Sequence, residues 1–349
     1  MPRAFLVLPG LFILMLPALP ASEPVPLPKD TLAAVLSVKD TPLGLAARRA
    51  TPTDNPLTEA KVRLGRKLFF DPILSVDGKI ACASCHQPDH GFASSTAVAV
   101  GVGSKQGRRN APSLLNRAYG SAFFWDGRAA TLEDQALHPI ASPQEMGHTV
   151  PEAVKRLQAS KEYVALFQAA FPDGVTATNL ARALASFERV LLTGNTPVDR
   201  FRAGRLQALN DRERHGLWLY ESRAQCWRCH SGSNFSDERF HNTGVSWGRT
   251  PADLGRYEIT RQEADRGRFK TPTLRGLIAT APYMHDGSLA TLDEVVDFYN
   301  RGGGKNPNLD PVLAPLGLSK TDTADLVAFL KALSGRPGDQ DEGFRPLRK

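Results

Sequence analysis

Apolar and polar residues follow one another mainly with the spacing of amphipathic helices. In the segment 178–191, Leu180, Leu184, Phe187 and Leu191 recur every three to four positions and predict a helix with one buried face. No stretch shows the sustained two-residue alternation of a β-strand, so we expect a mainly α protein. Residues that favour helix N-termini precede further such segments: Thr58 before 59–70, Thr149 with Pro151 and Glu152 before 153–171, Thr178 before 179–192, Asn210 before 211–222, and Asp322 before 323–333.

Two interruptions of this pattern predict the domain organisation. The segment 231–270 is rich in Gly, Pro and Arg and is expected to be a long loop. The sequence TGNTPVDRF at 193–201 breaks the helical pattern near the middle of the chain. We therefore expect one domain over 58–200 and a second over 201–349.

The N-terminus has the pattern of an export signal. Arg3 is followed by a short apolar run and then by the small residues Ala18 and Ala21, which indicates a signal peptide over 1–21. A Pro-rich segment, 22–57, follows it. We expect a periplasmic protein whose mature chain has no membrane span, because the only long apolar run is removed with the signal.

Composition adds little to this picture. The 349 residues are 42% hydrophobic and 23% charged, an ordinary globular balance for two domains. The net charge is +7, but no run of Lys and Arg is interleaved with aromatic residues, so we expect no nucleic-acid partner. A diffuse basic surface favours an acidic partner instead.

The chain's four cysteines form two copies of one motif. ACASCHQP at 81–88 and QCWRCHSG at 225–232 both contain Cys-x-x-Cys-His. Two disulfides, or one zinc site made of four thiolates, would also use four cysteines, but neither explains a histidine directly after each pair. Covalent c-type haem explains it, because the thiols bind the haem edge and the next imidazole reaches the iron. We therefore predict two covalent haems, held by Cys82, Cys85 and His86 and by Cys226, Cys229 and His230.

A second repeat lies downstream of each motif. The segments 111–139 and 271–299 align without a gap, pairing Pro112 with Pro272, Leu114 with Leu274, 126–127 with 286–287 and 130–132 with 290–292. This indicates two homologous haem domains, each with a lid segment that crosses the open face of its haem. Two similar turn-and-helix signals that arose by chance are the alternative.

The last aligned position distinguishes the two haems. Pro139 ends the first segment and has no side-chain donor, whereas Tyr299 ends the second. The first iron would keep an open coordination site, and the second would be closed by a phenolate. Met284 is the competing ligand; His285, or no side chain, completes the alternatives for the second iron.

The motifs together resemble the bacterial di-haem cytochrome c peroxidase and MauG superfamily. The residues that carry this resemblance are the two Cys-x-x-Cys-His motifs, RNAPSLLN, FWDGRAATLEDQ, PQEMG and TPTLR…APYMHDG, between about Pro56 and Leu333. The resemblance implies two all-α cytochrome c-like domains. The first would hold the haem that reacts with hydrogen peroxide, and the second would hold an electron-relay haem.

The resemblance also implies roles for individual residues. Glu145 matches the catalytic acid–base, Gln135 a hydrogen-bonding residue beside bound peroxide, and Trp125 the tryptophan between the haems. Arg128, beside the repeated turn, is expected to pair with a haem propionate. Asn110, Thr280 and Pro282 match calcium ligands, partly through backbone carbonyls.

Three functions compete on these grounds. The first is a peroxidase that draws electrons from a small cytochrome c or a cupredoxin. The second is a MauG-like enzyme that oxidises residues of a protein substrate. Tyr299 favours this second function, because the peroxidases have methionine at that position. Ala224 argues against it, because MauG has a tryptophan there that passes oxidation to the substrate surface. Trp218 and Trp227 are the candidates to replace that tryptophan. The third is a pure electron carrier, which would gain nothing from an open iron or from Glu145. A dimer is compatible with the sequence.

Overall fold

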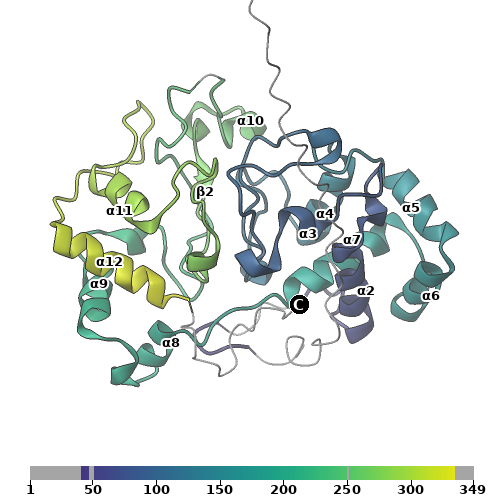
Figure 1. Ribbon diagram of the computed structural model, residues 1–349, viewed down its shortest axis with the longest axis horizontal. Coiled ribbons are helices and arrows are strands. Elements are labelled where there is room, and N and C mark those ends of the chain that lie inside the picture. The colour runs from purple at the N-terminus through teal and green to yellow at the C-terminus, as the bar shows by residue number, and fades with distance from the viewer. Residues whose placement is uncertain (1–40, 47–50, 250, 335–349) are drawn as a thin grey trace, which may run out of the picture.

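The computed structural model describes residues 41–46, 51–249 and 251–334 and shows two helical lobes side by side (Figure 1). The predicted signal peptide and much of the segment 22–57 lie outside this part of the chain. The first lobe contains α2 (Glu59–Phe70), α3 (Cys82–Cys85), α4 (Leu132–Ala141), α5 (Val150–Ala159), α6 (Lys161–Ala170) and α7 (Ala177–Arg189). The other helices are α8 (Pro197–Arg202), α9 (Asp211–Glu221), α10 (Tyr257–Thr260), α11 (Leu292–Asn300) and α12 (Lys320–Ala332).

Short elements connect these helices. Two strands of two residues each, β1 (Phe240–His241) and β2 (Phe269–Lys270), pair antiparallel within the predicted loop 231–270. The 3-10 helices are η1 (Pro72–Leu74), η2 (Pro88–His90), η3 (Val102–Ser104), η4 (Arg117–Tyr119), η5 (Leu206–Ala208), η6 (Cys226–Arg228), η7 (Glu263–Asp265) and η8 (Leu277–Ala279). The prediction of a mainly α protein is therefore confirmed. No helix in the described ranges is long and apolar enough to cross a membrane.

Three predicted N-caps are confirmed. The side chain of Thr58 accepts a hydrogen bond from the backbone N–H of Lys61 at the start of α2. Thr149 caps α5 in the same way, and Asn210 forms a reciprocal capping box with Glu213 at the start of α9. Each of these helices begins directly after a short polar side chain, because that side chain accepts a hydrogen bond from a backbone N–H of the first turn that has no partner within the helix.

Three other helix predictions are wrong in detail. The N-cap of α7 is Thr176 rather than Thr178, and that of α12 is Ser319 rather than Asp322. Asp322 is the capping-box partner three residues inside α12. The segment 153–171 is not one helix, because the side chain of Ser160 caps a second helix, α6.

Each lobe has its own apolar core, and one glycine in each core permits a close helix crossing. Buried residues from Val62 to Leu191 form the first cluster, and those from Val198 to Leu333 form the second. Gly65 of α2 packs on the backbone of α7 at Ala183, and Gly216 of α9 packs on the backbone of α12 at Asp325. A Cβ at either glycine would lie closer than 3.0 Å to a backbone carbonyl of the facing helix, a separation that real Cβ atoms essentially never show.

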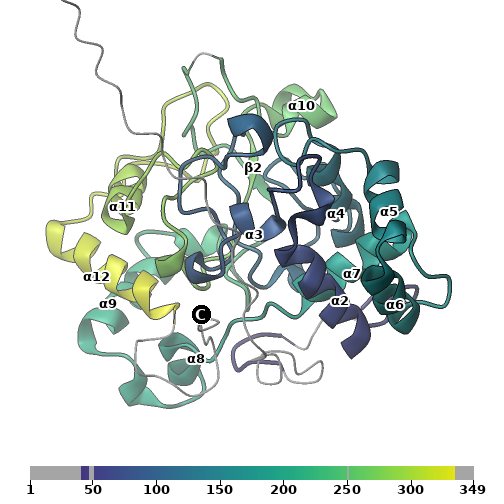
Figure 2. The ribbon, with the colours of Figure 1, turned by 45° about the vertical axis from the view of Figure 1, so that its right-hand side comes forward.

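The sequence repeat has the same backbone in both lobes. η4 and η8, and likewise α4 and α11, begin 160 positions apart. The turn between each pair is closed by an antiparallel bridge, Phe123 with Ala129 and Tyr283 with Leu289. Figure 2 shows α4 and α11 in their separate lobes.

The two copies meet face to face. The N–H of Asn110 donates to the carbonyl of His285 (2.8 Å), and the N–H of Lys270 donates to the carbonyl of Trp125 (2.7 Å). Asn110 and Lys270, like Trp125 and His285, are equivalent positions of the repeat. The contact is therefore reciprocal, as in a two-fold interface.

Candidate haem sites and the residues between them

The first Cys-x-x-Cys-His motif forms a single helical turn that sets the orientation of His86. Cys82–Cys85 make up α3, and the N–H of His86 donates to the carbonyl of Cys82 (2.9 Å). The Nδ1 of His86 lies 3.0 Å from the carbonyl oxygen of Phe92. Because a carbonyl only accepts, Nδ1 carries the proton, and Nε2 keeps its lone pair for a metal.

The second motif repeats this arrangement. The N–H of His230 donates to the carbonyl of Cys226 (2.9 Å), and its Nδ1 lies 3.1 Å from the carbonyl oxygen of Phe235. Burial lowers the pKa of His230 to about 4 and also lowers that of His86. Both imidazoles are therefore neutral near pH 7, which is the form that binds iron.

The cysteines have the properties needed for two separate haem attachments. All four are free thiols. Cys82 and Cys85 line one cavity and Cys226 and Cys229 line another, so the four do not converge on one zinc ion. Burial raises the pKa of Cys85 to about 11 and that of Cys226 to about 12, which keeps these sulfurs protonated. Paired thiols beside an iron-directed imidazole in a mostly apolar cavity fit a covalent c-type haem.

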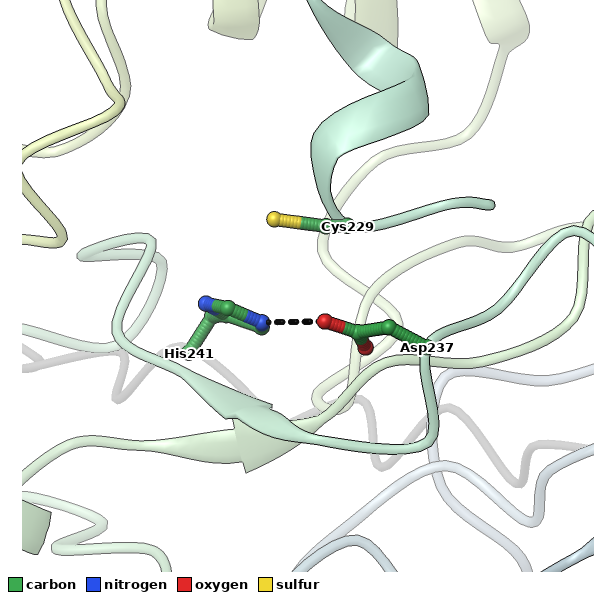
Figure 3. A group of neighbouring side chains, drawn as sticks. All are labelled: Cys229, Asp237 and His241. Atoms are coloured by element: carbon green, nitrogen blue, oxygen red, sulfur yellow. Dashed lines mark hydrogen bonds and ion pairs between the residues drawn. The ribbon is translucent and has the colours of Figure 1, made fainter. Parts of the chain in front are cut away.

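One further cluster near the second motif has ligand-type side chains. Cys229, Asp237 and His241 lie together in Figure 3, and within the described ranges they are the one such group of three. The Nε2 of His241 bonds Asp237 (2.9 Å) and its Nδ1 bonds Asp310 (2.6 Å). The hydrogen bond to Asp237 is the largest cause that raises the pKa of His241 to about 11. An imidazolium held between two carboxylates has no lone pair for a metal, so the cluster is an ion-pair network beside the second cavity.

The first cavity collects the predicted acid–base residues around His86. Its volume is about 440 Å³, and its lining includes His86, Gln135, Pro139 and Glu145. Burial raises the pKa of the Glu145 carboxyl, whereas the positive charge of Arg128 acts in the opposite direction. Gln135 and Pro139 both come from α4, the lid helix of the first lobe.

Arg128 lines the same cavity, but its guanidinium already has a partner. It pairs with Asp126 (2.8 Å) and lies 3.5 Å from the centre of the Phe124 ring. Asp126 also binds Arg109 (2.6 Å). Arg128 is therefore a positive charge held at the cavity wall, and its predicted pairing with a haem propionate stays a prediction.

The second cavity contains all three candidate side-chain ligands for the second iron, Tyr299, Met284 and His285. Its volume is about 270 Å³, and it is lined by His230, Met284 and Tyr299 among others. Tyr299 is the eighth residue of α11, and Pro139 is the eighth residue of α4. The predicted equivalence of these two positions thus holds in the structure. Burial is the largest cause that raises the pKa of Tyr299.

Trp125 lies between the two cavities and lines both. Its indole N–H donates to the carbonyl oxygen of Asn110 (2.9 Å). Asn110, Thr280 and Pro282 all line the second cavity, so the three predicted calcium ligands lie in one region. The amide of Asn110 donates to the carbonyl of Thr96 (3.0 Å), which fixes that side chain.

Two buried polar residues line the cavities; sequence analysis missed Glu188 and named His285 only as an alternative ligand of the second iron. Glu188 lines the first cavity and His285 lines the second, and each has a buried side-chain atom without a hydrogen-bond partner. Glu188 follows Leu184 by four positions on α7, so it is a charged residue on an apolar helix face. His285 is the repeat equivalent of Trp125, and its ring packs against Phe269 with centroids 3.5 Å apart.

Comparisons with known proteins agree with this geometry. Residues 59–207 match the family described as di-haem cytochrome c peroxidase. The methylamine utilization protein MauG of Methylorubrum extorquens is 42% identical over 290 residues, which cover 82% of this chain and 81% of the relative. Cytochrome c551 peroxidase of Nitrosomonas europaea is 36% identical over 84% of each chain.

A solved structure supports the same assignment. The crystal structure of a MauG-like protein associated with microbial copper homeostasis superposes with a TM-score of 0.79 and 32% identity. The match covers 87% of this chain and 97% of the other. This protein therefore belongs to the di-haem cytochrome c peroxidase and MauG family.

Proposed function

We propose that this protein is a periplasmic di-haem peroxidase that reduces hydrogen peroxide to water. Its electrons would come from a small redox protein, a cytochrome c or a cupredoxin. The observation that carries the proposal is the composition of the first cavity, which Glu145 and Gln135 line together with His86 and where Pro139 offers no ligand. The second cavity has Tyr299 at the position equivalent to Pro139.

When bound, the haem at His86 would supply an iron to which peroxide binds and the electrons that cleave its O–O bond. Glu145 would accept a proton from one oxygen of hydrogen peroxide and return it to the other, so that water leaves. The Gln135 amide would hold the peroxide by a hydrogen bond. Each peroxide consumes two electrons and two further protons and yields two molecules of water.

Trp125 would connect the two haems. It lines both cavities, and its backbone carbonyl accepts from Lys270 of the second lobe. An aromatic side chain between two redox centres divides one long electron transfer into two shorter steps. The indole N–H bonds a carbonyl, which is not a base, so Trp125 would keep its proton when it loses an electron.

A MauG-like oxidation of a protein substrate is the second candidate. Tyr299 favours it, because an anionic oxygen ligand stabilises ferric iron and would lower the potential of the second haem. Trp218 and Trp227 are 52% and 48% exposed near the second motif and offer outlets to the surface. A pure electron carrier is disfavoured, because a carrier needs neither an open iron nor an acid–base residue.

Peroxide titration of the purified haem-loaded protein separates these functions. With reduced cytochrome c present, a peroxidase should turn over rapidly and oxidise two cytochromes per peroxide. A long-lived oxidised state shared by both haems, and unaffected by the cytochrome, would instead support the MauG-like function. No spectral response to peroxide would contradict both.

Asn110, Thr280 and Pro282 would hold a calcium ion between the lobes. Their oxygen atoms are hard donors of the type that calcium prefers. Metal analysis of the purified protein, and loss of activity with a chelator that is restored by calcium, would test this site. Full activity in protein shown to contain no calcium would refute it.

A further inference from the structure

Among the residues that the structure describes, Glu188 has no counter-ion, and its carboxyl group lies in the wall of the first cavity. It lies near the end of α7, is 6% exposed, and has a buried Oε2 with no hydrogen-bond partner. It lines the same cavity as His86 and Glu145. A buried carboxylate is costly unless it is paired or takes up a proton, so its place beside a redox centre needs an explanation.

The charged groups around Glu188 are already committed to other partners. Arg189 binds Glu133 through two bonds of 2.6 and 2.7 Å. Arg117, the other nearby guanidinium, binds Glu238 at 3.1 and 3.0 Å. Cys82 lines the same cavity and would be neutral as a thioether. Glu188 is therefore surrounded by paired ions and neutral groups.

The other carboxyls of the cavity differ from Glu188 in this respect. Asp126 is bound by Arg109 and Arg128, and Glu258 is bound by Arg108 (2.9 and 3.1 Å). Each of these two therefore has a guanidinium partner. Glu145 is only partly buried, with the positive charge of Arg128 acting on it. Burial raises the pKa of Glu188 to about 8, close enough to neutral pH for its charge to respond to the haem.

We propose that Glu188 is a redox-linked proton site of the first haem. When one electron from the donor reduces the iron held by His86, the carboxylate of Glu188 takes up one proton from solvent and becomes a carboxylic acid. Oxidation of the iron releases that proton. Net charge in the cavity then stays constant, and no other bond forms or breaks. The inference rests on the proposed function only in that a haem occupies this cavity.

Spectroelectrochemical titration of the first haem from pH 6 to pH 10 tests this directly. Wild-type protein should show a midpoint potential that falls as pH rises, because the proton is bound more tightly by the reduced form. Glu188→Gln keeps the shape of the side chain and should flatten this slope. The potentials of the two proteins should coincide at the acid end and diverge at the alkaline end, where only the wild type carries the negative charge.

Two further variants make the result specific. Glu145→Gln should retain the slope, and Glu152→Gln, an exposed change on α5, should match the wild type throughout. Glu188→Met excludes an effect of the new amide and should behave like Glu188→Gln. An unchanged slope in both Glu188 variants, or its loss in Glu145→Gln instead, would overturn the proposal. Failure of the peroxidase function would appear separately, as no reaction of the wild type with peroxide.

Discussion

Replacing Gly65 by alanine places two opposing effects in direct competition. Alanine favours the helical backbone over glycine by about 1 kcal/mol in the interior of a helix such as α2. Against this, the new Cβ would meet the Ala183 carbonyl and would lie 3.0 Å from the Cβ of Phe187. The first effect predicts a more stable protein and the second a less stable one.

The packing effect should win. The Ala183 contact is with backbone, so it cannot be relieved by turning a side chain. The axes of α2 and α7 would have to separate by on the order of 1 Å, which loosens contacts throughout a close-packed core. Overpacking of this kind costs about 1–3 kcal/mol. We expect Gly65→Ala to lose up to about 2 kcal/mol of unfolding free energy after the helix gain is subtracted.

Equilibrium unfolding in guanidinium, followed by far-UV circular dichroism and haem absorbance, measures this loss. Gly216→Ala should give a loss of similar size in the second lobe, because its Cβ would meet the Asp325 carbonyl of α12. Gly107→Ala is the matched control, since its nearest neighbours are 3.8 Å away and no positive φ is required. A Gly65→Ala protein more stable than wild type would refute the reasoning about this helix crossing.

Three other predictions concern the two cavities and a buried ion pair of the second lobe. Glu145→Gln should slow the reaction with peroxide by about 100- to 10,000-fold without changing either haem spectrum. In the wild type this rate should fall on acidification, because only the carboxylate accepts a proton. The fall should occur at a higher pH than for an ordinary glutamate, because burial raises the pKa of Glu145. Stopped-flow absorbance measures the rate of the variant and the pH dependence of the wild type. Tyr299→Phe should change the low-spin spectrum while Met284→Leu leaves it intact, and the reverse outcome would make Met284 the ligand. Arg275→Met would leave the carboxylate of Asp199, bound at 2.7 and 2.8 Å, buried without a cation and should cost about 3–5 kcal/mol in thermal or chemical unfolding.

Local chemistry explains which helix starts were predictable. Thr58 and Asn210 each stand alone before a helical pattern, so one polar side chain was available for the first N–H groups. Before α7, Thr176 and Thr178 are both suitable, and only the backbone conformation selects Thr176. At α12 the N-cap Ser319 and its capping-box partner Asp322 are both residue types that favour an N-cap, so the sequence alone did not distinguish them.

The haem-binding motifs were predictable because their chemistry depends on spacing along the chain. A thiol pair and the following imidazole remain together in any compact turn, and η6 and α3 have this form. The isolation of Glu188 was not predictable in this way. It depends on contacts between residues far apart in sequence, because Arg189 is bound by Glu133 and Arg117 by Glu238.

The repeat explains how two alike lobes acquire unlike chemistry. Its two copies share turns, caps and helix starts, and they meet through reciprocal backbone hydrogen bonds. On this common backbone, position eight of the lid helix is Pro139 in one copy and Tyr299 in the other, and the central aromatic position is Trp125 in one and His285 in the other. Exchange of a few side chains would therefore be sufficient to leave one iron open and to close the other, as the proposed function requires. Because backbone symmetry fixes where each side chain lies, Tyr299→Pro and Pro139→Tyr are the changes that should make the two cavities alike.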